Sequence, residues 1–92
     1  MNRMAELIHE HSTHMRTREG QVFVARTYGE KQSDGLWEGW LEFHPIGGVG
    51  PVLKTGRETG QSSRAAMENW SLGLEGVYLQ GAFARAKIVP AR

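Results

Sequence analysis

The sequence contains no cysteine and no long hydrophobic run. Without cysteine the chain cannot form disulfide bonds, thiolate metal sites or a thiol nucleophile. No apolar stretch approaches the roughly 20 residues that a membrane-spanning helix requires. The apolar segment Met4–Ile8 is also too short to be the core of a signal peptide. We therefore expect a cytoplasmic protein with no membrane partner.

The sequence also lacks an excess of positive or negative charge. The formal net charge is +1, with 11 lysines and arginines against 10 aspartates and glutamates, which gives no general attraction to nucleic acid. Hydrophobic residues (39%) and charged residues (23%) occur in the proportions of an ordinary globular protein. The 92 residues are enough for one domain, whose modest core is often supplemented by association with a partner.

Motifs for catalysis are absent too. The sequence has no G-x-S-x-G nucleophile motif. Glu38 and Glu42 would lie about 13 Å apart on one strand face, which is too far for a coupled carboxylate pair. We therefore expect that the protein is not an enzyme.

Residues 1–19 are polar and show no sustained periodicity. We interpret them as a flexible N-terminal tail, and residues 20–88 as a single α+β domain. In the tail, His9, His11 and His14 have the spacing H-x-H-x-x-H, in which imidazoles can converge on one metal ion. Thr13 occupies the position that would complete H-E-x-x-H or H-x-H-x-D-H. We therefore favour solvated histidines and predict no metal and no cofactor.

The clearest strand of the sequence is Leu36–Phe43, in which apolar and polar residues alternate. A second strand, Gln21–Tyr28, is rich in β-branched and aromatic residues, and the segment Gly29–Gly35 joins the two strands as a hairpin. We predict that Arg26 pairs with Glu38 across this hairpin. The face toward the core then holds five residues, namely Phe23, Ala25, Trp37, Leu41 and Phe43.

Val52–Thr55 predicts a short third strand, and Ser63–Lys87 predicts a helical region with two apolar stripes. The first stripe holds Ala66, Trp70, Leu74, Val77, Gly81 and Ala84, and the second holds Ala65, Leu72, Leu79 and Phe83. Because a surface helix needs one apolar stripe, either the helix breaks near Gly73–Gly76 or a continuous helix is covered on both sides. The predicted fold is α+β, a three-stranded antiparallel sheet (β-β-β) packed on a C-terminal helix or kinked helix pair.

Apolar residues remain that this fold would not cover. They are Val24 and Trp40 on the outer sheet face, and Leu72, Leu79 and Phe83 on the second helical stripe. Surplus apolar surface of this kind marks an interaction site. The leading hypothesis is therefore a small non-enzymatic interaction or assembly module, which forms a homodimer or binds another protein partner.

A second hypothesis rests on the segment that leads into the helix, which is rich in glycine and flanked by basic residues. Its candidate contacts are Lys54, Arg57, Gly60, Gln61, Ser62 and Arg64. Free backbone amides at a helix start can hold an anion, so this segment suggests a phosphate-binding or nucleic-acid-binding module. The Walker pattern is not met, however, and Ser62 or Ser63 as an ordinary N-cap explains the same residues.

Part of the sequence resembles a family of small bacterial proteins of unknown function. The resemblance covers Trp37-x-Gly39-Trp40-Leu41-x-Phe43-x-Pro45, then Thr55-x-Arg57-Glu58-Thr59, and finally Trp70 and Tyr78-Leu79-x-Gly81-Ala82. It implies no activity. The predicted β-β-β-α order is also similar to that of HicB-type antitoxins, small partial RNase H-like folds that bind a toxin. This second likeness is one of topology, and it assigns no functional residue.

Overall fold

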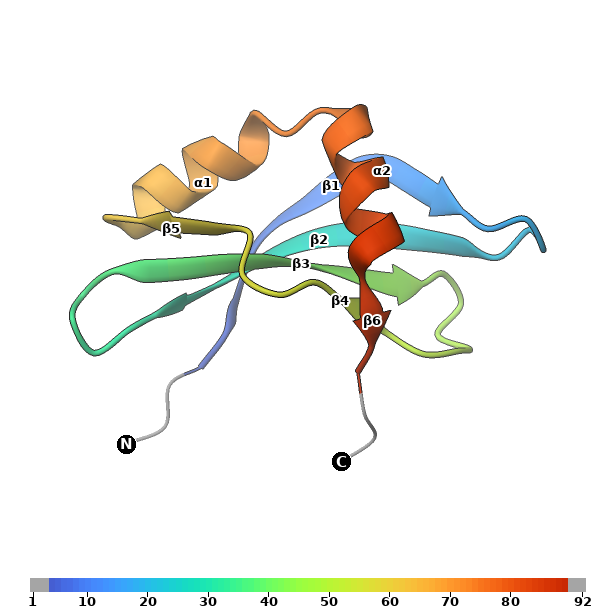
Figure 1. Ribbon diagram of the computed structural model, residues 1–92, viewed down its shortest axis with the longest axis horizontal. Coiled ribbons are helices and arrows are strands. Elements are labelled where there is room, and N and C mark those ends of the chain that lie inside the picture. Colours follow the sequence, from blue (N-terminus) through green and yellow to red (C-terminus); the bar gives the residue numbers. More distant parts are fainter. Residues whose placement is uncertain (1–3, 90–92) are drawn as a thin grey trace.

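The structure of the protein is a computed structural model that describes residues 4–89. It has the predicted α+β class: an antiparallel sheet with two C-terminal helices on one of its sides (Figure 1). The elements are β1 (Glu6–Arg16), β2 (Val22–Lys31), β3 (Trp37–Pro45), β4 (Leu53–Lys54), β5 (Thr59–Gln61), α1 (Arg64–Leu72), α2 (Gly76–Arg85) and β6 (Lys87–Ile88). The strand order is β1-β2-β3-β4-β6, and β5 pairs with β3. Neither α1 nor α2 is long and apolar enough to cross a membrane.

The interpretation of the N-terminal region as a flexible tail is wrong for residues 6–16, which form β1 and pair with β2. Two register shifts interrupt this pairing, between Leu7 and His9 and between Glu10 and His14. Each shift places extra residues in β1, so the strict alternation that identifies a strand in the sequence is lost. The predicted domain boundary at residue 20 therefore cuts through the sheet. The tail's first three residues lie outside the described residues.

The predicted pairing of β2 with β3 is wrong by four residues. Arg26 lies opposite Glu42 instead of Glu38, because β2 continues to Lys31 and the turn is shorter than expected. The turn closes where the Gln32 N–H donates to the carbonyl oxygen of Leu36 at 2.7 Å. A shift by an even number of residues leaves every side chain on its predicted face.

The core lies between the sheet and the helices, and all five sheet residues predicted for it are buried. The larger cluster consists of Met15, Phe23, Ala25, Leu41, Phe43, Leu79 and Ala82, and a smaller one of Ile8, Trp37 and Met67. Gly39 of β3 allows Met67 to approach, because a Cβ atom on this glycine would lie 2.5 Å from the Met67 sulfur. Helix α1 thereby packs close to the sheet.

The helical region breaks between Leu72 and Gly76, which decides between the two alternatives left open by the sequence. Helix α1 begins at the N-cap Ser63, whose side chain accepts a hydrogen bond from the Ala66 N–H at 3.0 Å. After the break, α2 turns a different face to the sheet. As a result Val77, predicted for the core stripe, is 81% exposed, and that part of the prediction is wrong.

Candidate functional site

One face of the sheet points away from both helices, and we call it the uncovered face (Figure 1). Along β2, its side chains alternate with residues buried under the helices. It is defined by Val22, Val24, Arg26, Tyr28 and Glu30 of β2 and by Glu38, Trp40, Glu42 and His44 of β3. Neighbouring strands extend this face on both sides, since residues paired across strands share a face.

A row of charged residues crosses the uncovered face from strand to strand. Glu10 of β1 lies opposite Arg26, Arg26 opposite Glu42, Glu42 opposite Lys54 of β4, and Lys54 opposite Lys87 of β6. We call these five residues the charge row; their signs are negative, positive, negative, positive and positive. The Arg26 Nε donates to Glu10 Oε1 at 2.9 Å, and this hydrogen bond raises the pKa of Arg26. Both ends of the row point to solvent.

Aromatic side chains stand beside the charge row. The ring of Tyr28 stacks on that of Trp40 with centroids 6.4 Å apart, and Lys54 Nζ lies 4.6 Å from the Trp40 ring centroid. Glu42 orders two rings, because Trp40 Nε1 donates to Glu42 Oε2 at 2.9 Å and His44 Nε2 lies 2.9 Å from Glu42 Oε1. These neighbours leave Trp40 only 9% exposed, so the expectation of an uncovered Trp40 is wrong.

The uncovered face has two hollows. One, of about 510 Å³, is bordered by Val24, Arg26, His44 and the glycine-rich segment that follows β3. The other, of about 250 Å³, lies at the opposite end, among Glu30, Trp40 and their neighbours. Both are open to solvent and have mixed polar and apolar walls. Hollows of this kind can receive side chains from the surface of another protein molecule.

Two of the residues predicted for an interface, Leu79 and Phe83, are in the core. The Phe83 ring lies 5.4 Å from Phe23 and 5.1 Å from Phe43, measured between centroids. The prediction that these two residues are uncovered is wrong, because the helix break turns α2 so that both face the sheet. Leu72 does stay on the surface and is 59% exposed, whereas Val24 is partly buried on the uncovered face.

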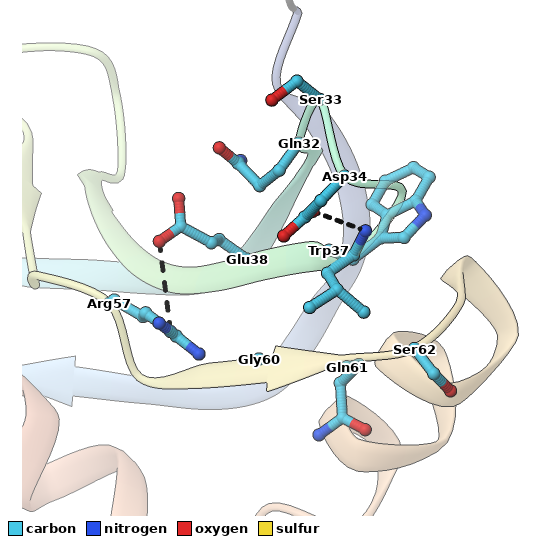
Figure 2. A pocket seen from close by; sticks show the side chains of 10 residues that line it. Gln32, Ser33, Asp34, Trp37, Glu38, Arg57, Gly60, Gln61 and Ser62 are labelled. Atoms are coloured by element: carbon cyan, nitrogen blue, oxygen red, sulfur yellow. Dashed lines mark hydrogen bonds and ion pairs between the residues drawn. The ribbon is translucent and has the colours of Figure 1, made fainter.

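The predicted anion contacts divide between separate places. Arg57, Gly60, Gln61 and Ser62 line a hollow of about 450 Å³ together with acidic residues of the β2–β3 turn and of β3 (Figure 2). Lys54 lies instead over Trp40.

The cations of this group already have partners. Arg57 Nε is 3.9 Å from a carboxylate oxygen of Glu38. Figure 2 marks this ion pair with a dashed line. Arg64 lies 3.8 Å from Glu6 and 3.4 Å from Glu68. These carboxylates reduce the attraction of the site for an added anion.

The three histidines of β1 do not converge. His11 is buried, and its Nε2 lies 2.8 Å from the Thr27 hydroxyl, whereas His14 lies opposite Val24 on the uncovered face. Burial, assisted by the nearby His9, lowers the pKa of His11 to about 4. Within residues 4–89, no group of three or more histidine, aspartate or glutamate side chains is arranged to hold a metal ion.

Sequence reasoning missed the charge row, because Glu10 was assigned to a tail and the β2–β3 register was displaced. It also missed a polar cluster beside α2, where Tyr78 donates to Glu58 Oε1 at 2.5 Å and Arg85 donates to the same oxygen at 2.6 Å. No pattern in the sequence marks these five residues, because other charged residues lie between them along the chain. A correct register was needed to align them.

Comparisons of the chain with protein-family models, with curated proteins and with solved structures found no match.

Proposed function

We propose that the protein is a non-enzymatic interaction module that self-associates through the uncovered face of its sheet. The observation that carries this proposal is the composition of that face, where Val22, Val24 and Tyr28 stand among paired charges. An antiparallel sheet often leaves one polar face to solvent, and on this face apolar side chains lie between the charged ones. Valine and tyrosine side chains here gain by removal from water, at roughly 25 cal/mol for each Å² buried.

The dimensions of the face set the extent of an interface. Strands β1, β2 and β3 have 11, 10 and 9 residues, so at about 4.8 Å spacing and about 3.4 Å rise they form a surface of roughly 14 Å by 30 Å. The two-residue strand β4 widens this surface at one point. A stable protein interface buries roughly 800 Å² on each partner, so an interface here also buries the loops that border the face. The aromatic residues and arginine of the face are also types that are enriched in interfaces.

The polar groups of the face support binding better than catalysis. Glu42 uses both carboxylate oxygens to order Trp40 and His44, and Arg26 is held by Glu10. Such contacts fix the shape of a surface before a partner arrives, which lowers the entropic cost of association.

The test is the solution mass of the wild-type protein at about 100 μM, measured by light scattering, together with one variant on each side of the molecule. Val24→Glu places a charge on the uncovered face and should give a folded monomer. The matched control Val77→Glu changes an exposed residue of α2, on the helix side, and should remain a dimer. Circular dichroism checks that both variants are folded.

Two results contradict the proposal. A wild-type protein that is monomeric at about 100 μM has no stable self-association, because stable interfaces dissociate in the micromolar range or below. A dimer that survives Val24→Glu but not Val77→Glu uses the helix side instead of the uncovered face.

The alternative expected from the sequence, a phosphate-binding or nucleic-acid-binding module, receives less support. The side chains of Arg57 and Arg64 each lie within 4 Å of a carboxylate. This alternative predicts that added phosphate or a short RNA shifts the amide resonances of Gly60, Gln61 and Ser62. The binding affinity should fall as the salt concentration rises. Unchanged spectra at millimolar phosphate and with RNA would remove it.

A further inference from the structure

We infer that two copies of the chain stack face to face about a two-fold axis that runs parallel to the strands, between β2 and β3. This inference rests on the proposed function and specifies how the second copy lies on the uncovered face. The axis reverses the strand order, so that β1 of one copy lies over β4 of the other and β2 lies over β3. Each charge row then meets the other row in the opposite direction.

The sequence of signs in the charge row makes this arrangement self-complementary. Glu10 of one copy meets Lys54 of the second copy, and Arg26 meets Glu42 of the second copy. By symmetry each contact occurs twice, and all four join opposite charges. Potentials of opposite sign across an interface fix its orientation and suppress other arrangements.

The same contacts relieve a conflict within each chain. Lys54 and Lys87 lie directly opposite each other in β4 and β6, and like charges in such positions are destabilising. In the stacked arrangement, Glu10 of the second copy lies over Lys54, the inner residue of this pair of cations. The negative end of each row therefore offsets part of the positive charge at the end of the other row.

A two-fold axis in the other in-plane direction, along the row, gives the opposite result. It places Glu10 over Glu10 and Arg26 over Arg26, so that like charges meet at every position. An axis perpendicular to the sheet leaves the uncovered face exposed. The order of charges thus selects the axis parallel to the strands.

Beside the charge row, the aromatic residues are also brought together. Tyr28 of one copy lies over Trp40 of the second copy, and Val24 lies over His44. At the far end, Glu30 would approach Glu38 of the second copy. Two features reduce the repulsion between these carboxylates. Stacked sheets cross at about 30°, so their ends diverge. Arg57 lies 3.9 Å from Glu38 and offsets its charge.

Pairing through the free edge of β1 is the main rival for a dimer of this chain. The two register shifts of β1 interrupt the regular spacing of its outer N–H and C=O groups. Bulges of this kind protect sheet edges from pairing with another strand. The face is therefore the better surface for a second copy.

The experiment exchanges charges at the ends of the row. Glu10 and Lys54 are separated by three strand spacings, roughly 14 Å, so they do not contact each other within one chain. Glu10→Lys alone and Lys54→Glu alone each place like charges in contact in the homodimer. We expect the dimer dissociation constant of each variant to rise by about tenfold or more. An equimolar mixture should restore wild-type affinity and give a heterodimer, seen by native mass spectrometry.

The controls keep the result interpretable. Lys31→Glu makes the same charge change at an exposed residue whose strand partner is the buried Trp37, and it should leave the dimer unchanged. If Lys54→Glu does not fold, Lys87→Glu replaces it in the mixture with Glu10→Lys, with a smaller effect expected in the same direction.

The outcomes separate this inference from the proposed function. A wild-type monomer overturns both. A wild-type dimer whose charge variants dimerise unchanged, or whose mixture forms no preferred heterodimer, overturns the stacked arrangement and leaves self-association standing. Weakened single variants that recover only when mixed support the inference, because within one chain the exchanged residues are too far apart to interact.

Discussion

His11 and Thr27 are joined by a hydrogen bond of 2.8 Å between the imidazole Nε2 and the threonine hydroxyl, under the cover of α1. The Ser71 hydroxyl donates to the same Thr27 oxygen at 2.7 Å. The Thr27 hydroxyl therefore bridges the His11 imidazole and the Ser71 hydroxyl. Three polar residues of β1, β2 and α1 are thus satisfied by one another in the core.

The protonation of His11 predicts that the free energy of unfolding depends on pH. Its pKa is lowered to about 4 in the folded protein from the ordinary value of 6.5 for a histidine side chain. The unfolded chain binds the extra proton between these values, so stability is complete above pH 6.5 and falls as pH decreases through this window. We expect unfolding to require about 2 kcal/mol less at pH 5 than at pH 7.

Urea titrations at the two pH values measure this difference. His11→Gln should remove most of it, whereas the control His14→Gln should keep it, because His14 is exposed. Equal pH dependence in wild type and His11→Gln would contradict the assignment.

Gly39→Ala should destabilise the protein by about 1–3 kcal/mol, as overpacking of a core does. The new Cβ atom would lie 2.5 Å from the Met67 sulfur and 2.9 Å from Thr59 Cγ2. Gly56→Ala is the matched control, since a Cβ atom there meets nothing within 4 Å. Thermal unfolding of both variants measures the difference, and equal melting temperatures would show that Met67 moves aside freely.

Tyr78→Phe should lower the free energy of unfolding by roughly 1–3 kcal/mol, the cost of losing a hydrogen bond to a charged group. The Tyr78 hydroxyl donates to the Glu58 carboxylate, whose side chain is only 9% exposed. Arg85 still contacts this carboxylate, so the variant should fold. Urea denaturation measures the change; a wild-type midpoint in Tyr78→Phe would mean that Arg85 and solvent satisfy Glu58.

Glu30→Gln should stabilise the monomer by roughly 0.2–1 kcal/mol, the magnitude of cross-strand pair effects. Glu30 and Glu38 lie directly opposite each other on the uncovered face, so that two like charges meet. Glu19→Gln, at an exposed residue of the turn between β1 and β2, is the control and should have no comparable effect. A Glu30→Gln protein less stable than wild type would indicate that Glu30 has a favourable partner.

The sequence predicted the sheet face on which each side chain lies better than it predicted which residues pair across strands. The alternation around Trp40 placed each side chain of β3 on its correct face, because that property depends only on parity. The partner of each residue depends on where a turn closes, and the extension of β2 to Lys31 shifted every pair by four. The charge row depends on which residues pair across strands, so it could not be predicted from the sequence.

Local backbone preferences explain the remaining successes and failures. Glycines at 73 and 76 made a helix break predictable, and the break occurs there. The strand β1 was missed because its bulges bring Ile8, His11 and Met15 to the core at unequal spacings. A period-2 search does not detect that pattern, and of these three residues only Ile8 is of a type enriched in strands.

The order of the strands also bears on how the chain folds. Strands β1 to β4 lie side by side in the order in which they are synthesised, so most pairings join neighbours along the chain. The turns that join β1 to β2 and β2 to β3 are short, so each of these two pairings closes only a short loop. The helices follow the first five strands along the chain, so a sheet that forms first has one apolar face in water until α1 and α2 cover it. During that interval the bulged edge of β1 protects the growing sheet from aggregation with other chains.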